Sequence, residues 1–307
     1  MNVFILGCSG FIGSNLIKYL LNYPKYIITG FDKNDSKINE FKDQIKFIQG
    51  DIQNENGLIK EIISDSDVII DLIAHANPIK YIETPIEVVD LNFSQNLNII
   101  KNCIDHKKRL IQFSSCEVYG MTGGDHSPVI FNEENSNLIL GPIKNQRWIY
   151  SCAKQLLERL LYAYGKSGSI NYTIIRPFNF VGPKIDFLIK NEEDGCPRAP
   201  AQFISSLLYG RSLKLVDGGK NYRTYLYIDD ATRAIKLIID NKNGLFNNEI
   251  INIGAPNNET RIEDLANLMI DLYQDIIGKN FKHGVENVDN LDFYGEGYED
   301  CDRRIPD

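Results

Sequence analysis

Tyr150 and Lys154 are the residues whose types and spacing point most directly to chemistry. Side chains four positions apart on a helix share one face, so the phenol and the ammonium would be neighbours. A phenol with a pKa of about 10 is almost wholly protonated at neutral pH, and a nearby ammonium lowers that pKa by stabilising the phenolate. Such a tyrosine can accept a proton from a hydroxyl group. Surface helices also carry this pair without any catalytic role, so the rest of the chain must decide.

The N-terminus supplies a nucleotide-binding pattern. A short strand, Asn2–Leu6, runs into the glycine turn of residues 7–13 (GCSGFIG) and then into an amphipathic helix that ends at about Asn22. Strand, glycine turn and helix are the context that a dinucleotide fingerprint requires, although the first gap is one residue wider than in GxGxxG. The positive end of the helix would face a pyrophosphate. We expect the cofactor to lie against Gly7, Gly10, Phe11, Ile12 and Gly13.

The ends of the next strands carry further cofactor candidates. Asp32 ends the second strand, where a carboxylate accepts hydrogen bonds from the adenosine ribose. A 2′-phosphate would meet this negative charge, so NAD is favoured over NADP, and the adjacent Lys33 weakens that preference only slightly. Asp51 and Ile52 follow the third strand, where an acidic side chain commonly meets the adenine edge. Ala74 lies in a loop of small residues that would cover the cofactor.

Short apolar strands alternate with helices, without hairpin signals, as far as the strand Tyr172–Arg176. This alternation predicts an α/β fold with a Rossmann-type, doubly wound parallel sheet and a smaller C-terminal substrate-binding domain. We expect residues 1–176 and 226–254 to form the NAD-binding domain, and residues 177–225 and 255–307 to form the substrate-binding domain. The last fifteen residues, Phe293–Asp307, are rich in glycine and charge and are expected to form a tail.

Composition limits the possible partners. The 307 residues suffice for one large or two moderate domains, and the net charge of −8 argues against nucleic acid or an anionic membrane surface. The six cysteines show no CxxC spacing and the four histidines stand apart, which predicts no metal site and no disulfide framework. No apolar run approaches about 18 residues, so we expect no membrane span. These features predict a soluble, cytoplasmic protein.

Taken together, GxxGxxG, Asp32, YxxxK and RPFNxxGP resemble the extended short-chain dehydrogenase/reductases of the NAD-dependent epimerase/dehydratase family. More narrowly, the sequence is similar to the UDP-glucuronate decarboxylases, and above all to the UDP-apiose/UDP-xylose synthases. The segments that carry this resemblance are SSCEVYG, KNQRWIYSCAKQLLERL, RPFNFVGPKIDF, LKLVDGGKNYRTYLYIDDA, INIGAPNNE and FYGEGYEDCDRRIPD. Members of these families continue for some tens of residues past the RIPD-like segment. The substrate-binding domain is therefore expected to lack its usual C-terminal end.

The resemblance implies decarboxylation of UDP-glucuronic acid through a 4-keto intermediate, giving UDP-apiose, UDP-xylose or both. Tyr150 would accept the C4 hydroxyl proton with Lys154 beside it, Ser115 would bind the C4 oxygen, and Glu117 would orient the uronate and act around C5. Arg304 would reach the substrate carboxylate, or Arg303 if the register differs by one. Cys116 stands where the apiose-forming enzymes carry a cysteine implicated in proton transfer. Further contacts to the UDP-sugar would come from Asn179, Arg198, Lys214 and Arg223, the last on the pyrophosphate.

The resemblance also implies a homodimer that pairs the helices Pro85–His106 and Trp148–Lys166 from each subunit. Apolar surface for this pairing would come from Ile99, Ile100, Cys103, Leu157, Leu160 and Leu161.

Other activities of the same fold stay open at this point. An oxidative decarboxylase would release a UDP-4-keto-pentose and NADH, and nothing in the sequence excludes it. A 4-epimerase is disfavoured by Arg304, and a dehydratase by Cys116, because dehydratases carry an Asp-Glu pair where this chain has Cys116 and Glu117. A non-catalytic NAD-binding regulator could have lost Tyr150, Lys154 and Glu117, but all three are present.

Overall fold

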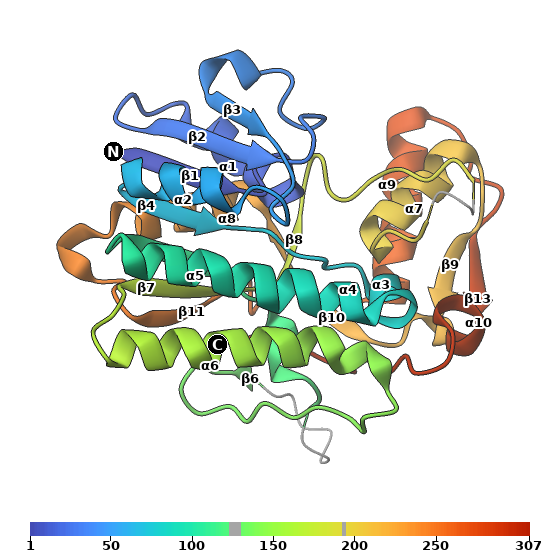
Figure 1. The fold of residues 1–307 in the computed structure, drawn as a ribbon. Helices are drawn as coiled ribbons and strands as arrows, with labels where there is room; N and C mark the ends of the chain where they lie inside the picture. The colour runs from blue at the N-terminus through green and yellow to red at the C-terminus, as the bar shows by residue number, and fades with distance from the viewer. Residues whose placement is uncertain (123–129, 192–194) are drawn as a thin grey trace.

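Seven parallel strands form the central sheet of the computed structural model, which describes residues 1–122, 130–191 and 195–307 (Figure 1). The order of the strands reverses at β1, which pairs with β2 on one side and β4 on the other, so the predicted doubly wound parallel sheet is confirmed. From one edge to the other the strands are β3 Lys46–Gln49, β2 Ile27–Asp32, β1 Asn2–Leu6, β4 Val68–Asp71, β5 Arg109–Phe113, β7 Tyr172–Pro177 and β11 Glu249–Ile253.

Helices cover both faces of this sheet, as its nearly continuous apolar strands require. On one face α1 Phe11–Leu20 packs with α8 Ile228–Asp240, over a core that contains Ile5, Ile70 and Ile111. On the other face lie three helices over a second core: α2 Asn56–Asp65, α5 Asn96–Asp105 and α6 Ile149–Lys166. Figure 1 shows these three helices side by side in front of the sheet.

The helix predicted at Pro85–His106 is a continuous helical run with a change of pitch in its middle. It begins as α4 Pro85–Val89, continues as a π-helical stretch at Asp90–Gln95, and ends as α5. A short helix, α3 Pro78–Glu83, precedes it and is capped by the Asn77 side chain, which accepts a hydrogen bond from the Ile79 amide at 3.1 Å. The helix α6 begins one residue later than predicted, after a 3₁₀ turn at Gln146–Trp148.

The remaining elements gather beside the carboxyl ends of the sheet strands (Figure 1). A turn at Asp217–Gly219 separates two strands, β9 and β10, which pair with different partners. The strand β10 Tyr222–Tyr227 pairs with β8 Asn179–Val181 and β12 Glu259–Arg261, whereas β9 Leu213–Val216 pairs with β13 Val285–Val288. The helices here are α7 Ala199–Tyr209, α9 Ile262–Ile277 and α10 Asn290–Tyr294. The domain boundaries themselves stay a prediction.

The prediction of a tail over Phe293–Asp307 is wrong. The strand β14 Ile305–Pro306 pairs in parallel with β6 Ile130–Phe131, and Cys301, Arg304 and Ile305 are buried. Asp300, Arg303 and Arg304 meet opposite charges on other elements, whereas Glu296, Asp302 and Asp307 are exposed. All six cysteines are free thiols. Within the three described ranges, no helix is both long enough and apolar enough to cross a membrane.

Candidate active site

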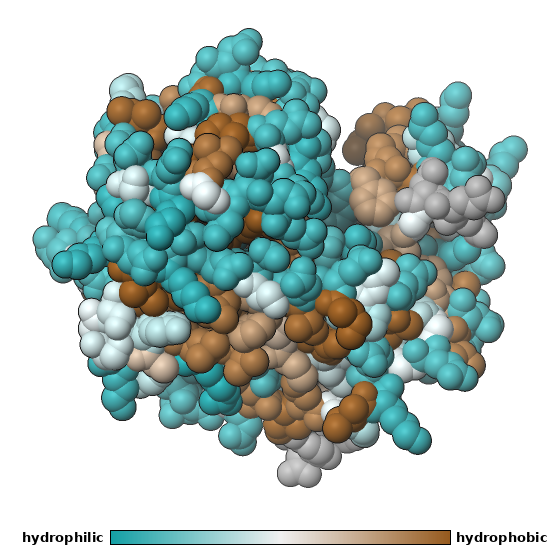
Figure 2. All heavy atoms as spheres, in the orientation of Figure 1, coloured by the Kyte–Doolittle hydropathy of each residue, from teal (hydrophilic) through white to brown (hydrophobic). Residues whose placement is uncertain are grey.

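Two adjoining cavities open at the carboxyl edge of the sheet. The first, which we call the glycine-turn cavity, has a volume of about 460 Å³ and is lined by five residues of the glycine turn (Gly7, Gly10, Phe11, Ile12 and Gly13) together with Ala74, Ser115, Cys116 and Tyr150. The second, the arginine cavity, has a volume of about 300 Å³ and extends toward α7 and α10. Figure 2 shows a hollow between the part that carries the sheet and the part that carries α7 and α9. Both cavities share the lining residues Pro78, Glu117, Asn179, Phe180 and Arg198.

The glycine turn is shaped by close backbone approaches. Gly7 has a φ of +79°, and its amide donates a hydrogen bond to the Phe31 carbonyl at 2.9 Å. A Cβ atom at Gly13 would lie 2.4 Å from the Gly7 carbonyl oxygen, so α1 can begin directly on the turn only with glycine there. Because the first amides of a helix have no partner within the helix, the turn directs backbone donors toward the cavity.

Asp32 lies beside this turn, at the end of β2. Its carboxylate accepts a hydrogen bond from the Ser9 amide at 2.9 Å. Burial raises the pKa of Asp32, and the amides of Ser9 and Asn34 oppose that rise by stabilising the charged form. Lys33 forms an ion pair with Asp51 at 2.9 Å. The charge of the lysine next to Asp32 is therefore balanced by Asp51. Ile52 is buried.

Tyr150 and Lys154 are both buried on α6, and Tyr150 lines the glycine-turn cavity whereas Lys154 does not. The ring of Tyr150 stacks on Tyr81 with 4.8 Å between centroids. Burial raises the pKa of Tyr150 above its ordinary value, and hydrogen bonding to Ser115 opposes that rise. Lys154 donates to the Phe113 carbonyl at 3.0 Å, and burial lowers its pKa to about 8. The expected lowering of the Tyr150 pKa by Lys154 is therefore not observed, because burial has the larger effect.

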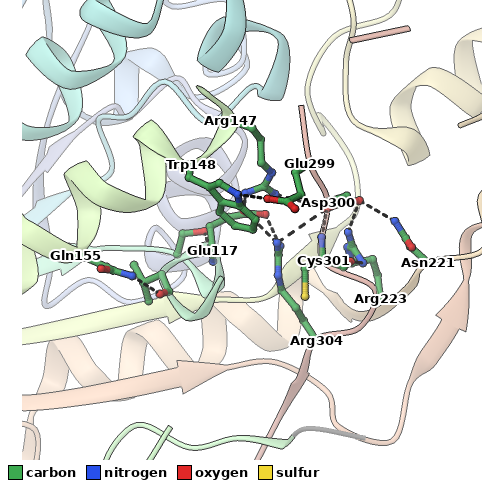
Figure 3. Close-up of polar contacts among 12 residues, drawn as sticks. Glu117, Arg147, Trp148, Gln155, Asn221, Arg223, Glu299, Asp300, Cys301 and Arg304 are labelled. Atoms are coloured by element: carbon green, nitrogen blue, oxygen red, sulfur yellow. Dashed lines mark hydrogen bonds and ion pairs between the residues drawn. The ribbon is translucent and has the colours of Figure 1, made fainter. Parts of the chain in front are cut away.

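Glu117 lies where the two cavities meet, and two arginines hold it (Figure 3). Arg304 reaches it from the C-terminal segment with both terminal nitrogens, and Arg147 reaches it from the turn before α6. Burial by itself would raise the pKa of Glu117, but the charges of Arg147 and Arg304 outweigh this and hold the pKa well below its usual range. Arg303 instead pairs with Glu259 at 2.6 Å, so Arg304 is the arginine of this segment that reaches the site.

Asp300 is the second acidic group of this cluster (Figure 3). Its carboxylate accepts from Arg223 at 2.6 Å and from Asn221 at 3.0 Å, and lies 3.6 Å from Arg147. Three guanidinium groups, those of Arg147, Arg223 and Arg304, therefore lie around the two carboxylates of Glu117 and Asp300. Sequence reasoning missed Arg147 and Asp300. Both lie inside segments that carry the family resemblance, directly before α6 and within the supposed tail.

The other predicted substrate contacts are already engaged with protein groups. Arg198 donates hydrogen bonds to the Asp186 carboxylate from its side-chain Nε and from its backbone amide, each at 2.9 Å. It also lines both cavities. Asn179 donates to the Thr224 carbonyl at 3.2 Å. Lys214 and Arg223 line the arginine cavity, whereas Arg304 lies behind Glu117 and lines neither cavity.

Cys116 is buried between Ser115 and Glu117. Burial raises the pKa of its thiol to about 11, although the positive charge of Arg304 works in the opposite direction. At neutral pH the side chain is therefore a thiol, which can donate a proton but is a poor base.

Known proteins resemble this chain over its whole length. The family model described as "NAD dependent epimerase/dehydratase family" matches residues 3–254. This chain belongs to that family. The bifunctional polymyxin resistance protein ArnA of Wigglesworthia glossinidia brevipalpis is 42% identical over 310 residues, which cover 99% of this chain but only 46% of that protein. The UDP-D-apiose/UDP-D-xylose synthase 1 of Arabidopsis thaliana is 38% identical, covering 100% of this chain and 84% of that one.

The solved structures agree on the fold. The PbgP3 protein of Burkholderia pseudomallei superposes with a TM-score of 0.84 at 34% identity, covering 100% of this chain and 87% of that chain. The cofactor of the epimerase/dehydratase family is NAD, and the residues of this chain fit it. The glycine turn leaves room for a pyrophosphate against the start of α1, and Asp32 lies beside the turn to receive ribose hydroxyls.

Proposed function

We propose that this protein is an NAD-dependent UDP-glucuronate decarboxylase that acts through a 4-keto intermediate and forms UDP-apiose, UDP-xylose or both. The observation that carries the proposal is the pairing of Glu117 with Arg147 and Arg304 beside Tyr150. A planar guanidinium can donate two hydrogen bonds to one carboxylate. Two arginines at this position therefore suit a substrate that carries a carboxylate. Relatives named as UDP-apiose/UDP-xylose synthases support the same substrate class.

The residues divide the work between proton transfer and charge binding. Bound NAD would accept a hydride from C4 of the sugar and later return it. Tyr150 takes the proton of the C4 hydroxyl, with Ser115 binding the same oxygen. The resulting ketone is β to the C6 carboxylate, so carbon dioxide leaves while the ketone accepts the electron pair as an enolate. A proton then returns to C5.

The arginine cavity would hold the rest of the substrate. Arg223, Lys214, Arg198 and Asn179 line it, and the guanidinium groups of the two arginines suit a pyrophosphate. The uronate carboxylate would compete with Glu117 for Arg147 and Arg304. Glu117 is fully ionised while both arginines hold it, so it can exchange a proton with C5 only after the substrate loosens this hold.

Purified protein with UDP-glucuronic acid and NAD tests the proposal when carbon dioxide, net NADH and the product sugar are followed together. Carbon dioxide without net NADH supports a closed redox cycle. Carbon dioxide with equal NADH identifies the oxidative variant, and an epimer without carbon dioxide identifies a 4-epimerase. Absence of any turnover by protein that binds NAD would contradict the proposal and favour a regulator. Tyr150→Phe should abolish every product, whereas Tyr162→Phe, at an exposed position of the same helix, should not.

We also propose a homodimer built on α4, α5 and α6, but with different residues from those first predicted. Among the six predicted contact residues, all but Leu160 are buried in the core of the single chain. The exposed apolar side chains of these helices are Ile86, Leu156 and Tyr162, and Figure 2 shows hydrophobic side chains gathered over this face. Leu156→Glu should lower the solution mass to that of one chain, whereas Leu237→Glu on α8 should not. A monomeric native protein at micromolar concentration would refute the proposal. A cytoplasmic location stays a proposal, supported by the free thiols.

A further inference from the structure

Asp71 is a fully buried carboxylate to which the mechanism above gives no task. It ends β4 in the otherwise apolar strand VIID, and none of its surface is exposed. Gln112 on β5 lies opposite it in the sheet register and is also buried. Two polar residues side by side in the centre of a buried sheet are costly unless their hydrogen bonds are satisfied, so their presence calls for a specific explanation.

These two residues belong to a closed ring of hydrogen bonds that contains Lys154. Gln112 donates to Asp71 at 3.0 Å and also approaches the Phe113 carbonyl at 3.5 Å, to which Lys154 donates. On the other side, Lys154 approaches Asn96 at 3.4 Å, and Asn96 donates to the Ile73 carbonyl at 3.4 Å. The Ile73 amide donates to the Asp71 carboxylate at 3.0 Å, which closes the ring.

The donors around Asp71 favour its charged form. Burial raises the pKa of Asp71, whereas the charge of Lys154 and the hydrogen bonds from Gln112 and Ile73 oppose that rise. Its two oxygens accept from different N–H groups, those of Gln112 and Ile73, and such bonds are stronger to a carboxylate than to a neutral carboxyl group. The Gln112 amide nitrogen is fixed in this orientation because its second neighbour, the Phe113 carbonyl, can only accept.

The other carboxylate near Lys154 is already neutralised. Glu158 lies one turn further along α6 and forms a two-pronged pair with Arg176, at 3.1 and 2.6 Å. Asp71 has no such arginine partner among the residues of the described ranges. We therefore propose that Asp71 is a positioning residue for the catalytic pair: through the Gln112 and Asn96 bridges it is the counter-ion that keeps Lys154 charged and in place below Tyr150. The proposal rests on the proposed function only in taking Lys154 to support Tyr150.

The decisive variant is Asp71→Asn, which keeps the shape but removes the charge. Burial lowers the pKa of Lys154 to about 8, and Asp71 opposes that shift, so the variant should carry a neutral lysine at neutral pH. Its rate relative to the native enzyme should be close to one at pH 6 and fall at least tenfold by pH 8. A uniform loss at every pH would mean that Asp71 is merely structural. Asp65→Asn, at an exposed carboxylate just before β4, is the matched control.

A readout without turnover separates this proposal from the proposed function. Between its folded and unfolded pKa values a lysine binds more protons in the unfolded chain, so the free energy of unfolding rises with pH there. In the native protein this rise should begin near pH 8; in Asp71→Asn it should extend down through pH 7. The double variant Asp71→Asn, Lys154→Met should lack the part of the rise that Lys154 contributes, and the part that Lys37 contributes should be unchanged in all three proteins. If the unfolding free energies of the native protein and of Asp71→Asn depend on pH in the same way, Asp71 and Lys154 are not coupled, whatever reaction the enzyme catalyses.

Discussion

Replacing Glu117 by glutamine should destabilise the protein, because two buried arginines would lose their counter-ion. The Arg147 and Arg304 side chains are only 2% and 1% exposed, whereas Glu117 keeps 19% of its side chain exposed on the cavity side. Glutamine has nearly the same shape, so the change removes charge and leaves packing in place. Asp300 would then be the remaining carboxylate near three guanidinium groups.

The expected magnitude follows from the burial of the arginines. Removing one partner of a buried ion pair costs roughly 3–5 kcal/mol, and the partial exposure of Glu117 places this case near the lower end, at about 3 kcal/mol. The folded-state pKa of Glu117 is depressed, so its stabilisation is present above the unfolded pKa of about 4.3 and is lost as the pH falls below it. The difference between native protein and variant should therefore be constant from pH 6 to 8 and shrink below about pH 4.

Urea unfolding followed by tryptophan fluorescence measures the free energy of unfolding with a fluorophore that lies beside Arg147. The single tryptophan, Trp148, is buried, and the Arg147 guanidinium lies 4.5 Å from its ring centroid. Glu40→Gln is the matched control, because Glu40 is 71% exposed and pairs with Lys184 at 3.8 Å. The reasoning is refuted if Glu117→Gln is as stable as the native protein, or if its deficit persists unchanged in acid.

Three further predictions concern the cofactor and the product. Asp32→Asn should weaken NAD binding by roughly 1.5–3 kcal/mol and relax discrimination against NADP; equal affinity of the native protein for both would contradict the role of Asp32. Gly13→Ala should lower NAD affinity in titrations because its Cβ would displace the Gly7 carbonyl, whereas Gly57→Ala, with open space around it, should bind NAD normally. Cys116→Ser should keep NAD binding and carbon dioxide release but abolish the branched sugar in product analysis; an unchanged product ratio would mean that Cys116 only packs.

The sequence by itself determined the sheet and the cofactor side of the site. The glycine spacing of residues 7–13, the apolar strands and the Tyr150–Lys154 pair are local patterns, and each reports a conformation or a helix face directly. Because parallel strands bring their carboxyl ends to one edge, Asp32 and Ser115 could be placed near the glycine turn without any knowledge of long-range packing.

Only the tertiary structure decided how the charges pair. Glu117 and Arg304 are 187 positions apart, and Arg147 and Asp300 carry no periodic signal, so nothing local tells a buried ion pair from a solvated charge. The C-terminal segment looked like a solvent-exposed tail for the same reason. The register of β4 against β5, which places Asp71 opposite Gln112, also cannot be predicted from the residues of either strand alone. A charge is stable in the interior only when partners from other elements surround it, and which partners arrive is settled by the packing of the whole chain.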